Sequence, residues 1–299
     1  MIESIIFCFK SMLLGIVEGI TEFLPVSSTG HLIVFEELLG YKSSPEYINA
    51  YSYIIQLGAI LAVIVLYRKK ILATLTNLFP KKENGVVVRP YRQTGMRFWI
   101  TLAIACIPGF IAVMTIGDIV DNYLFNGVSV AIVLILGGVA MILAEKGTQK
   151  KRAGRIDQSN SQWLDVTTKQ AILIGCFQCL SVIPGMSRSA STIIGGWFAG
   201  LSTPASAEFS FFLAIPVMIG MSLLKMIQSG GFGGMTPTEI VSLIIGFVVS
   251  FLVALLVVKK FISYLQTKTM VPFAIYRLIF GALVLILALT GIVGFAEAI

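Results

Sequence analysis

Two glutamates in an apolar N-terminal segment, Glu18 and Glu22, are four residues apart, so a helix would place both carboxylates on one face. Two like charges one turn apart in apolar surroundings either share a proton or bind a cation. Hard divalent ions prefer oxygen ligands, and Mg²⁺ often combines one or two carboxylates with water and substrate phosphate. We therefore predict a Mg²⁺ or Ca²⁺ site at Glu18 and Glu22. A structural carboxylate pair that caps a turn is the alternative.

A run of hydroxyl side chains and the only histidine of the chain follow Pro25. Ser27, Ser28 and Thr29, with main-chain amides at the start of a helix, suit an anion. The same residues could serve only as helix caps. His31 favours the chemical role, because a histidine in apolar surroundings needs a polar partner and can act as a general acid or base.

A second polar cluster follows Pro184, where one cation, Arg188, lies among four hydroxyl side chains: Ser187, Ser189, Ser191 and Thr192. A guanidinium presents a rigid fork of donors that fits phosphate oxygens and does not easily lose its charge. Arg188 therefore needs an anion. The alternative to phosphate is a salt bridge, which could also coexist with phosphate binding, to one of three carboxylates: Glu18, Glu22 or Glu208.

Taken together, these residue types suit a lipophilic phosphorylated substrate. Two acids can hold a metal, an arginine and hydroxyls can bind phosphate, and the surroundings are apolar. Loss of phosphate would proceed by in-line attack of a nucleophile or water, with the metal and Arg188 stabilising charge on the transferred group.

The composition places these residues in a membrane protein. The chain has 299 residues, of which 57% are hydrophobic and 12% charged, and its mean hydropathy is +0.91. This length allows about six to eight spans and one membrane domain, residues 1–299. The net charge of +7 comes from basic residues clustered in a few loops, which is typical of membrane anchoring and not of nucleic-acid binding.

The apolar segments predict an all-α integral membrane protein. Two regions, Ile5 to Leu39 and Ala171 to Leu201, are each interrupted by a Pro, Ser and Gly cluster, so we predict two re-entrant hairpins of half-helices. Six further segments are predicted spans: Ile48 to Tyr67, Phe98 to Ile116, Val128 to Ala144, Ala205 to Ile227, Ile240 to Val258 and Pro272 to Val293.

The distribution of Lys and Arg predicts the orientation. Basic residues fill three loops, 68–97, 146–169 and 259–268, which should be cytoplasmic, whereas 117–127 and 229–238 contain none and should be outside. The six spans and the loop charges agree with each other only if the first hairpin enters the membrane from outside and the second enters from the cytoplasm. Both termini are then external.

Each half of the chain, about 1–145 and 146–299, then has one hairpin and three spans in opposite orientation, which is an inverted-topology repeat. A weak sequence similarity between Gly15-Ile-Val-Glu18 and Gly175-Cys-Phe-Gln178 supports the repeat. Such repeats commonly place their site where broken helices of both halves meet, so the two polar turns should be neighbours.

Two long motifs, Glu18-Gly-Ile-Thr-Glu22-Phe-Leu-Pro-Val-Ser-Ser-Thr-Gly-His31 and Pro184-Gly-Met-Ser-Arg188-Ser-Ala-Ser-Thr, resemble those of the bacterial undecaprenyl-pyrophosphate phosphatase family, associated with bacitracin resistance. The similarity spans nearly the whole chain. Ala190 stands where the family usually has glycine. Three shorter segments are also similar to the family: Gln56-Leu-Gly58, Ala207-Glu-Phe-Ser210 and Pro272-Phe-Ala-Ile-Tyr-Arg277.

The resemblance implies hydrolysis of undecaprenyl pyrophosphate to undecaprenyl phosphate and inorganic phosphate, which recycles the lipid carrier for peptidoglycan synthesis. It implies a metal-dependent site on the outer face of the bacterial plasma membrane. Glu18 and Glu22 would hold the metal. Ser28 would be the nucleophile, supported by His31 three residues further along the chain. Direct attack by His31 on the phosphate is the competing mechanism. By resemblance, Arg188 with Ser187 and Thr192 would bind phosphate. The neighbouring hydroxyl residues Ser27, Thr29 and Ser189 are further candidate phosphate ligands.

Two other function classes fit parts of the sequence. Inverted repeats with broken helices also occur in transporters, so a transporter or flippase of a phosphorylated lipid or anion is the main alternative. A membrane scaffold would not need charged residues at two turns. No nucleic-acid partner is expected. The sequence is compatible with a homodimer and leaves the oligomeric state open.

Overall fold

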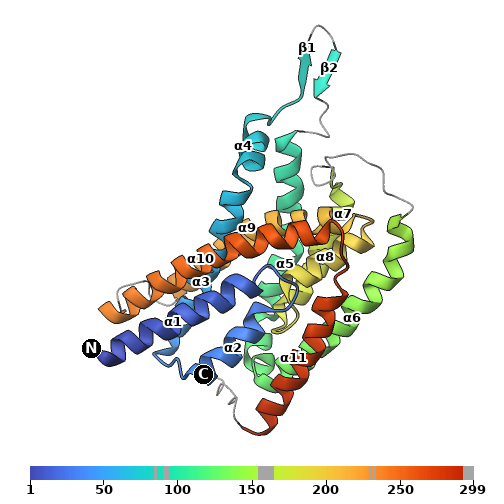
Figure 1. The fold of residues 1–299 in the computed structure, drawn as a ribbon. Coiled ribbons are helices and arrows are strands. Elements are labelled where there is room, and N and C mark those ends of the chain that lie inside the picture. The colour runs from blue at the N-terminus through green and yellow to red at the C-terminus, as the bar shows by residue number, and fades with distance from the viewer. Residues whose placement is uncertain (84–85, 90–93, 154–164, 229–230, 232–233, 292–299) are drawn as a thin grey trace.

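The computed structural model describes the chain except residues 84–85, 90–93, 154–164, 229–230, 232–233 and 292–299 (Figure 1). The described chain is almost entirely helical. The helices are α1 (Ile2–Thr21), α2 (Ser28–Leu39), α3 (Pro45–Leu66), α4 (Arg68–Thr76), α5 (Gly95–Leu124), α6 (Gly127–Ala153), α7 (Thr168–Gln178), the 3-10 helix η2 (Cys179–Val182), α8 (Arg188–Phe198), α9 (Thr203–Gln228), α10 (Pro237–Leu265) and α11 (Val271–Leu289).

Two short antiparallel strands, β1 (Lys81–Glu83) and β2 (Val86–Arg89), form a hairpin that projects beyond α4 at one end of the molecule (Figure 1). The hairpin lies in the first predicted basic loop. The all-α prediction therefore holds for the apolar body and misses this appendage, because the alternation that marks a strand is weak in so short and charged a segment.

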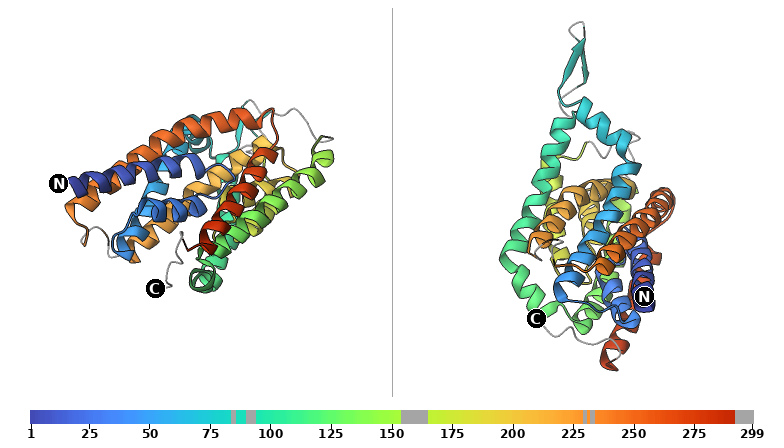
Figure 2. Two further views of the ribbon diagram at one scale, coloured as in Figure 1. Left: turned by 60° about the horizontal axis from the view of Figure 1, so that its bottom comes forward. Right: turned by 90° about the vertical axis from the view of Figure 1, so that its left-hand side faces the viewer.

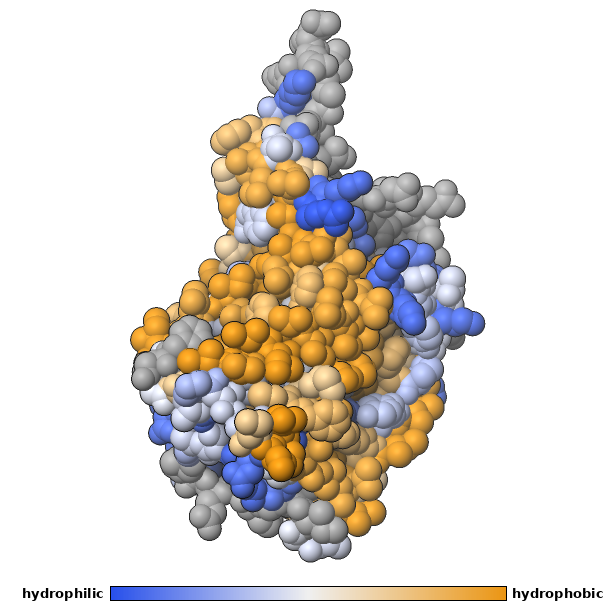
Figure 3. Space-filling model, turned by 60° about the vertical axis from the view of Figure 1, so that its left-hand side comes forward, coloured by the Kyte–Doolittle hydropathy of each residue, from blue (hydrophilic) through white to orange (hydrophobic). Residues whose placement is uncertain are grey.

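Seven helices in the described residues are long and apolar enough to cross a membrane. Six of them, α3, α5, α6, α9, α10 and α11, match the predicted spans except at two ends: Tyr67 follows the end of α3, and Thr290 and Gly291 follow the end of α11. Residues 292 and 293 of the last span lie outside the described residues. The seventh is α1, the first half of a predicted hairpin. Apolar side chains cover most of the face in Figure 3. The protein is a multi-pass membrane protein.

The predicted outer loop at 117–127 is mostly helical. Helix α5 continues to Leu124, because an isolated glycine such as Gly117 weakens a helix without ending it. Asp121 consequently lies on α5, and its carboxylate is 3.8 Å from the ammonium of Lys225 on α9.

Both broken regions contain the same local turn. The chain bends at Pro25 and Pro184, and α2 and α8 begin just after Ser27 and Ser187. These two serines have φ values of 72° and 71°, and they are the only non-glycine residues with positive φ in the described chain. Each serine hydroxyl accepts a hydrogen bond from the main-chain N–H three residues on, at 3.3 Å. The serines therefore act as helix caps, as the alternative reading of the sequence allowed.

The first helix of each broken region packs along a long helix of the other half of the chain. Helix α1 packs along α10, and α7 packs along α5, while α6 lies beside α11 (Figures 1 and 2). A Cβ at Gly15 of α1 would lie 2.7 Å from the carbonyl oxygen of Gly246, and one at Gly175 of α7 would lie 2.5 Å from that of Ala105. Small residues at these positions let the backbones approach closely, which is how helices associate in lipid.

Candidate active site

The two polar turns meet at Glu22. The Ser28 hydroxyl donates a hydrogen bond to Glu22 Oε2 at 2.5 Å, and Arg188 Nη2 donates to Glu22 Oε1 at 3.1 Å. The Glu22 and Arg188 side chains are only 8% and 11% exposed, so water screens their attraction weakly. This ion pair joins residues 166 positions apart in the chain. The predicted proximity of the turns is confirmed.

Of the three carboxylates proposed as partners of Arg188, Glu22 forms the salt bridge. Glu208 instead accepts hydrogen bonds from Lys70 at 2.8 and 2.9 Å. The Arg188 guanidinium also donates from Nη1 to the Ser210 carbonyl at 3.2 Å. Two of the five N–H donors of a guanidinium are thus used within the described chain, which leaves three for phosphate oxygens.

Two predicted phosphate ligands instead join elements of the fold. The Ser189 hydroxyl donates to the Leu24 carbonyl at 2.9 Å, which ties α8 to the first turn. The Thr192 hydroxyl is fully buried, 2.6 Å from the hydroxyl of Ser210 on α9. Both hydroxyls contribute to the packing that holds Arg188 in place.

Three other hydroxyl residues lie where the two helices begin. Ser27 and Ser187 cap α2 and α8, and Thr29 is half-buried with no side-chain hydrogen bond to another described residue. Because the first N–H groups of a helix lack partners within it, the starts of α2 and α8 are both suited to an anion. The phosphate-binding roles of these residues stay predictions.

Glu18 is a site carboxylate that forms no hydrogen bond or salt bridge within the described chain. Its side chain is fully buried, and neither carboxylate oxygen has a hydrogen-bond partner there. Such a group is costly unless it binds a proton or a cation. The described residues contain no group of three or more His, Cys, Asp or Glu side chains that could hold a metal. Two carboxylates could hold an ion only if water and phosphate completed its shell, as Mg²⁺ allows, so the metal site stays a prediction.

His31 faces away from Ser28, contrary to the predicted contact. Its Nδ1 is 2.7 Å from the Ser27 carbonyl oxygen, to which it donates, and its Nε2 is 2.7 Å from the Tyr276 hydroxyl. The imidazole also stacks on Phe280, with ring centroids 3.9 Å apart. Packing against α11 decides this direction. The residue that contacts the Ser28 hydroxyl is Glu22.

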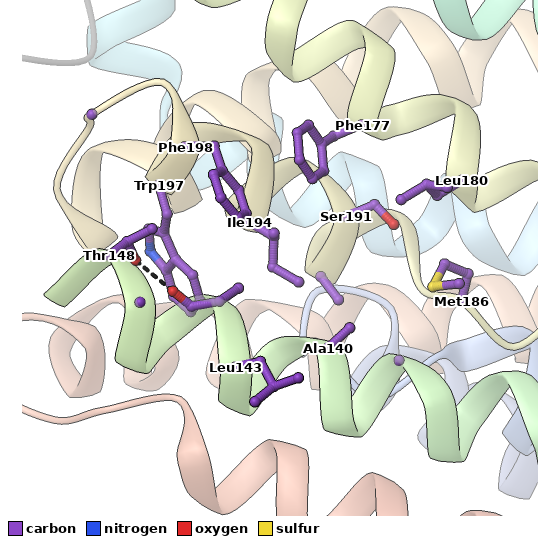
Figure 4. Close-up of a pocket in the computed structure, with 15 residues that line it drawn as sticks. Ala140, Leu143, Thr148, Phe177, Leu180, Met186, Ser191, Ile194, Trp197 and Phe198 are labelled. Carbon is purple, nitrogen blue, oxygen red and sulfur yellow. Dashed lines mark hydrogen bonds between the residues drawn. The ribbon is translucent and has the colours of Figure 1, made fainter.

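A cavity of about 720 Å³ lies between α6 and α8 (Figure 4). Ser191 and Trp197 of α8 face Leu143 of α6 across it, and the lining is mostly apolar. Arg188 and Thr192 contact α9 from the other face of α8. The cavity thus lies on the opposite face of α8 from these contacts, and its mostly apolar lining suits hydrocarbon.

A family model described as bacitracin resistance protein BacA matches residues 11–283, which include both turns and α11 up to Leu283. The chain belongs to this BacA family. A protein of Ruminiclostridium cellulolyticum is 54% identical over 97% of this chain and 99% of its own length. A protein of Clostridium tetani is 48% identical over 95% of this chain and 97% of its own length. A protein of Thermoanaerobacter pseudethanolicus is 44% identical over 95% of this chain and 98% of its own length. All three are named undecaprenyl-diphosphatase.

Tyr276 lies in the segment Pro272 to Arg277 that resembles the family, but the sequence predicted no role for it in the site of this BacA-family member. Tyr276→Phe should lower the steady-state rate of phosphate release about two- to tenfold, because a typical hydrogen bond contributes about 0.5–1.5 kcal/mol and this one holds the ring orientation of His31. Tyr123→Phe is the matched control, since Tyr123 is 73% exposed. Equal rates for both variants would show that the hydroxyl of Tyr276 has no part in turnover.

Proposed function

We propose that this protein hydrolyses undecaprenyl pyrophosphate to undecaprenyl phosphate and inorganic phosphate, and so recycles the carrier lipid for cell-wall synthesis. The main support for the proposal is the arrangement at Glu22, because one oxygen of this carboxylate accepts a hydrogen bond from Ser28 and the other accepts one from Arg188. Two helix N-termini border this arrangement inside an apolar bundle, which suits a diphosphate attached to a lipid. The names of the relatives agree with this activity.

In the proposed reaction, Ser28 Oγ attacks the terminal phosphorus in line with the bridging oxygen. The new O–P bond forms as the bond to the bridging oxygen breaks, and undecaprenyl phosphate leaves. Glu22 takes the Ser28 proton and releases it to water, and undecaprenyl phosphate leaves as an anion. Water then attacks the phosphoserine, Glu22 takes a proton from that water, and inorganic phosphate leaves as Ser28 regains its proton. Arg188 binds the equatorial oxygens throughout.

His31 has a supporting part in this proposal. It anchors the turn by donating to the Ser27 carbonyl, next to the nucleophile. Direct attack by His31 is disfavoured, because both ring nitrogens have hydrogen-bond partners and one ring face packs on Phe280.

Glu18 and Glu22 would hold a divalent cation, Mg²⁺ or Ca²⁺. The buried, unpartnered carboxylate of Glu18 supports this assignment. When bound, the ion supplies positive charge against the oxygens of the diphosphate.

The proposed topology is an inverted repeat in which α1–α2 and α7–α8 are re-entrant hairpins, with six spans and the site open to the outer face of the plasma membrane. The equivalent serine caps and the equivalent α1–α10 and α7–α5 contacts support it. Glu18 and Gln178 occupy matching places: both are buried, and both have side-chain oxygens without a partner in the described chain. Glu22, Ser28 and Arg188 come from one chain, so the proposal does not need the second copy of a homodimer.

A trapped phosphoenzyme tests the nucleophile. Rapid quenching of the purified protein with a lipid labelled in its terminal phosphate should give a label that is stable to acid, maps to Ser28 and is absent from Ser28→Ala. Phosphohistidine is acid-labile and stable to base, so a base-stable label on His31 would refute the serine mechanism.

The same protein in detergent distinguishes the enzyme from the transporter alternative. No gradient exists in detergent micelles, so a transporter or flippase has no transport to perform there. Failure of the protein to release phosphate from the diphosphate lipid would contradict the proposed function.

A further inference from the structure

Arg277 of α11 is a fully buried cation whose described partners are main-chain carbonyls. Its Nε donates to Leu134 at 3.3 Å, Nη1 to Pro25 at 3.3 Å and to Met186 at 2.9 Å, and Nη2 to Gly185 at 3.0 Å. It forms no salt bridge with a described residue. A cation buried without a carboxylate is costly, so four converging carbonyls indicate a specific task.

Three of these carbonyls belong to the two polar turns. Pro25 lies two residues before Ser27, the cap of α2, and Gly185 and Met186 directly precede Ser187, the cap of α8. One planar guanidinium therefore contacts both turns just before the helices that carry the site begin. The turns are distant in the chain, so their spacing depends on such tertiary contacts.

Helix α6 leaves room for this guanidinium at Gly137. A Cβ there would lie 2.0 Å from Arg277 Nη2 and 2.8 Å from Cζ, and 3.4 Å from the sulfur of Met186. The two closest atoms belong to the flexible end of a side chain. Alanine at this position should therefore displace the guanidinium and leave the helix backbone in place.

We propose that Arg277 is a positioning residue that holds the two turns at the spacing at which Arg188 reaches Glu22. This inference rests on the proposed function. The guanidinium touches neither Glu22 nor Ser28 in the described structure, so it acts through the turns. A displacement of one turn would lengthen the 3.1 Å contact between Arg188 and Glu22 and misplace the phosphate-binding donors.

The test is Gly137→Ala, with Gly220→Ala on α9 as the control, because a Cβ at Gly220 meets no atom within 4 Å. We expect Gly137→Ala to lower kcat about ten- to a hundredfold, since misplacement of catalytic groups by about 1 Å costs up to that much, with KM changed less than about twofold. The control should keep the kcat of the unmodified protein. Arg277→Lys retains the positive charge but loses the forked set of guanidinium donors, so it should lower kcat by a similar factor. This variant replaces Gly137→Ala in the test if Gly137→Ala does not fold.

Hydrogen–deuterium exchange adds a measurement that does not depend on activity. In Gly137→Ala, amide exchange should rise in peptides that cover both turns, residues 22–31 and 183–192, and stay unchanged in α10. Exchange that rises only in α6 and α11 would indicate a packing defect and overturn the inference, as would an unchanged kcat. If the unmodified protein releases no phosphate from the lipid, the proposed function fails, while the exchange data still decide the role of Arg277.

Discussion

Glu22→Gln should lower phosphate release from the diphosphate lipid by at least about a hundredfold, the lower range of what a positioned general base contributes. The amide cannot take the Ser28 proton, and it cannot neutralise Arg188, although glutamine retains the shape of the side chain. The measurement is the initial rate of phosphate release by purified protein in detergent, together with its elution profile and unfolding midpoint to show that it remains folded.

Glu37→Gln is the matched control for this prediction. Glu37 lies on α2 but its side chain is 38% exposed, and it faces Lys42 at 3.5 Å. Surface pairs of this kind contribute little, so the control should turn over normally. Near-normal turnover of Glu22→Gln would remove Glu22 from both its proposed roles, proton acceptor and metal ligand.

Arg188→Lys should lower turnover about a hundredfold, the effect expected when one preorganised donor for transition-state charge is lost. Lysine retains the positive charge, but a single ammonium cannot replace a planar fork that contacts Glu22, the Ser210 carbonyl and phosphate oxygens together. The loss should appear in kcat, measured over a range of lipid concentrations.

Arg68→Lys provides the control for the loss of the fork. Arg68 is exposed and donates to the Val65 carbonyl at 2.9 Å. Its replacement should leave kcat and KM unchanged. If Arg188→Lys also kept the kcat of the unmodified protein, Arg188 would have a structural role only.

The sequence predicted the membrane body well for a physical reason. Backbone groups in hydrocarbon must be satisfied within the segment, so long apolar runs are helices. Four of the six predicted spans lie wholly in helices of the structure, and the other two extend slightly past the ends of α3 and α11. Proline, glycine and serine clusters likewise marked both turns. The ends of elements were less predictable: α5 runs on to Leu124, and β1 and β2 pair in a loop that was identified only by its charge.

Within the site, local pattern identified the residues but not their partners. Glu18, Glu22, Ser28, His31 and Arg188 all stood out by type, because ionisable groups are rare in apolar segments. Spacing along one helix suggested that His31 would reach Ser28. In the structure His31 instead contacts Tyr276 and Phe280 of α11, and the Ser28 hydroxyl donates its hydrogen bond to Glu22.

The sequence by itself determined that this is a helical membrane protein with two polar turns that contain acids, hydroxyls and one arginine. Only the tertiary structure decided which of these groups meet, that Ser189 and Thr192 hold elements together, and that Arg277 contacts both turns. Hydrophobicity and helical periodicity are properties of a short stretch of chain, so sequence reveals them. The direction of a side chain across a helix interface depends on how distant helices pack, and here that packing joins Glu22 to a residue 166 positions away.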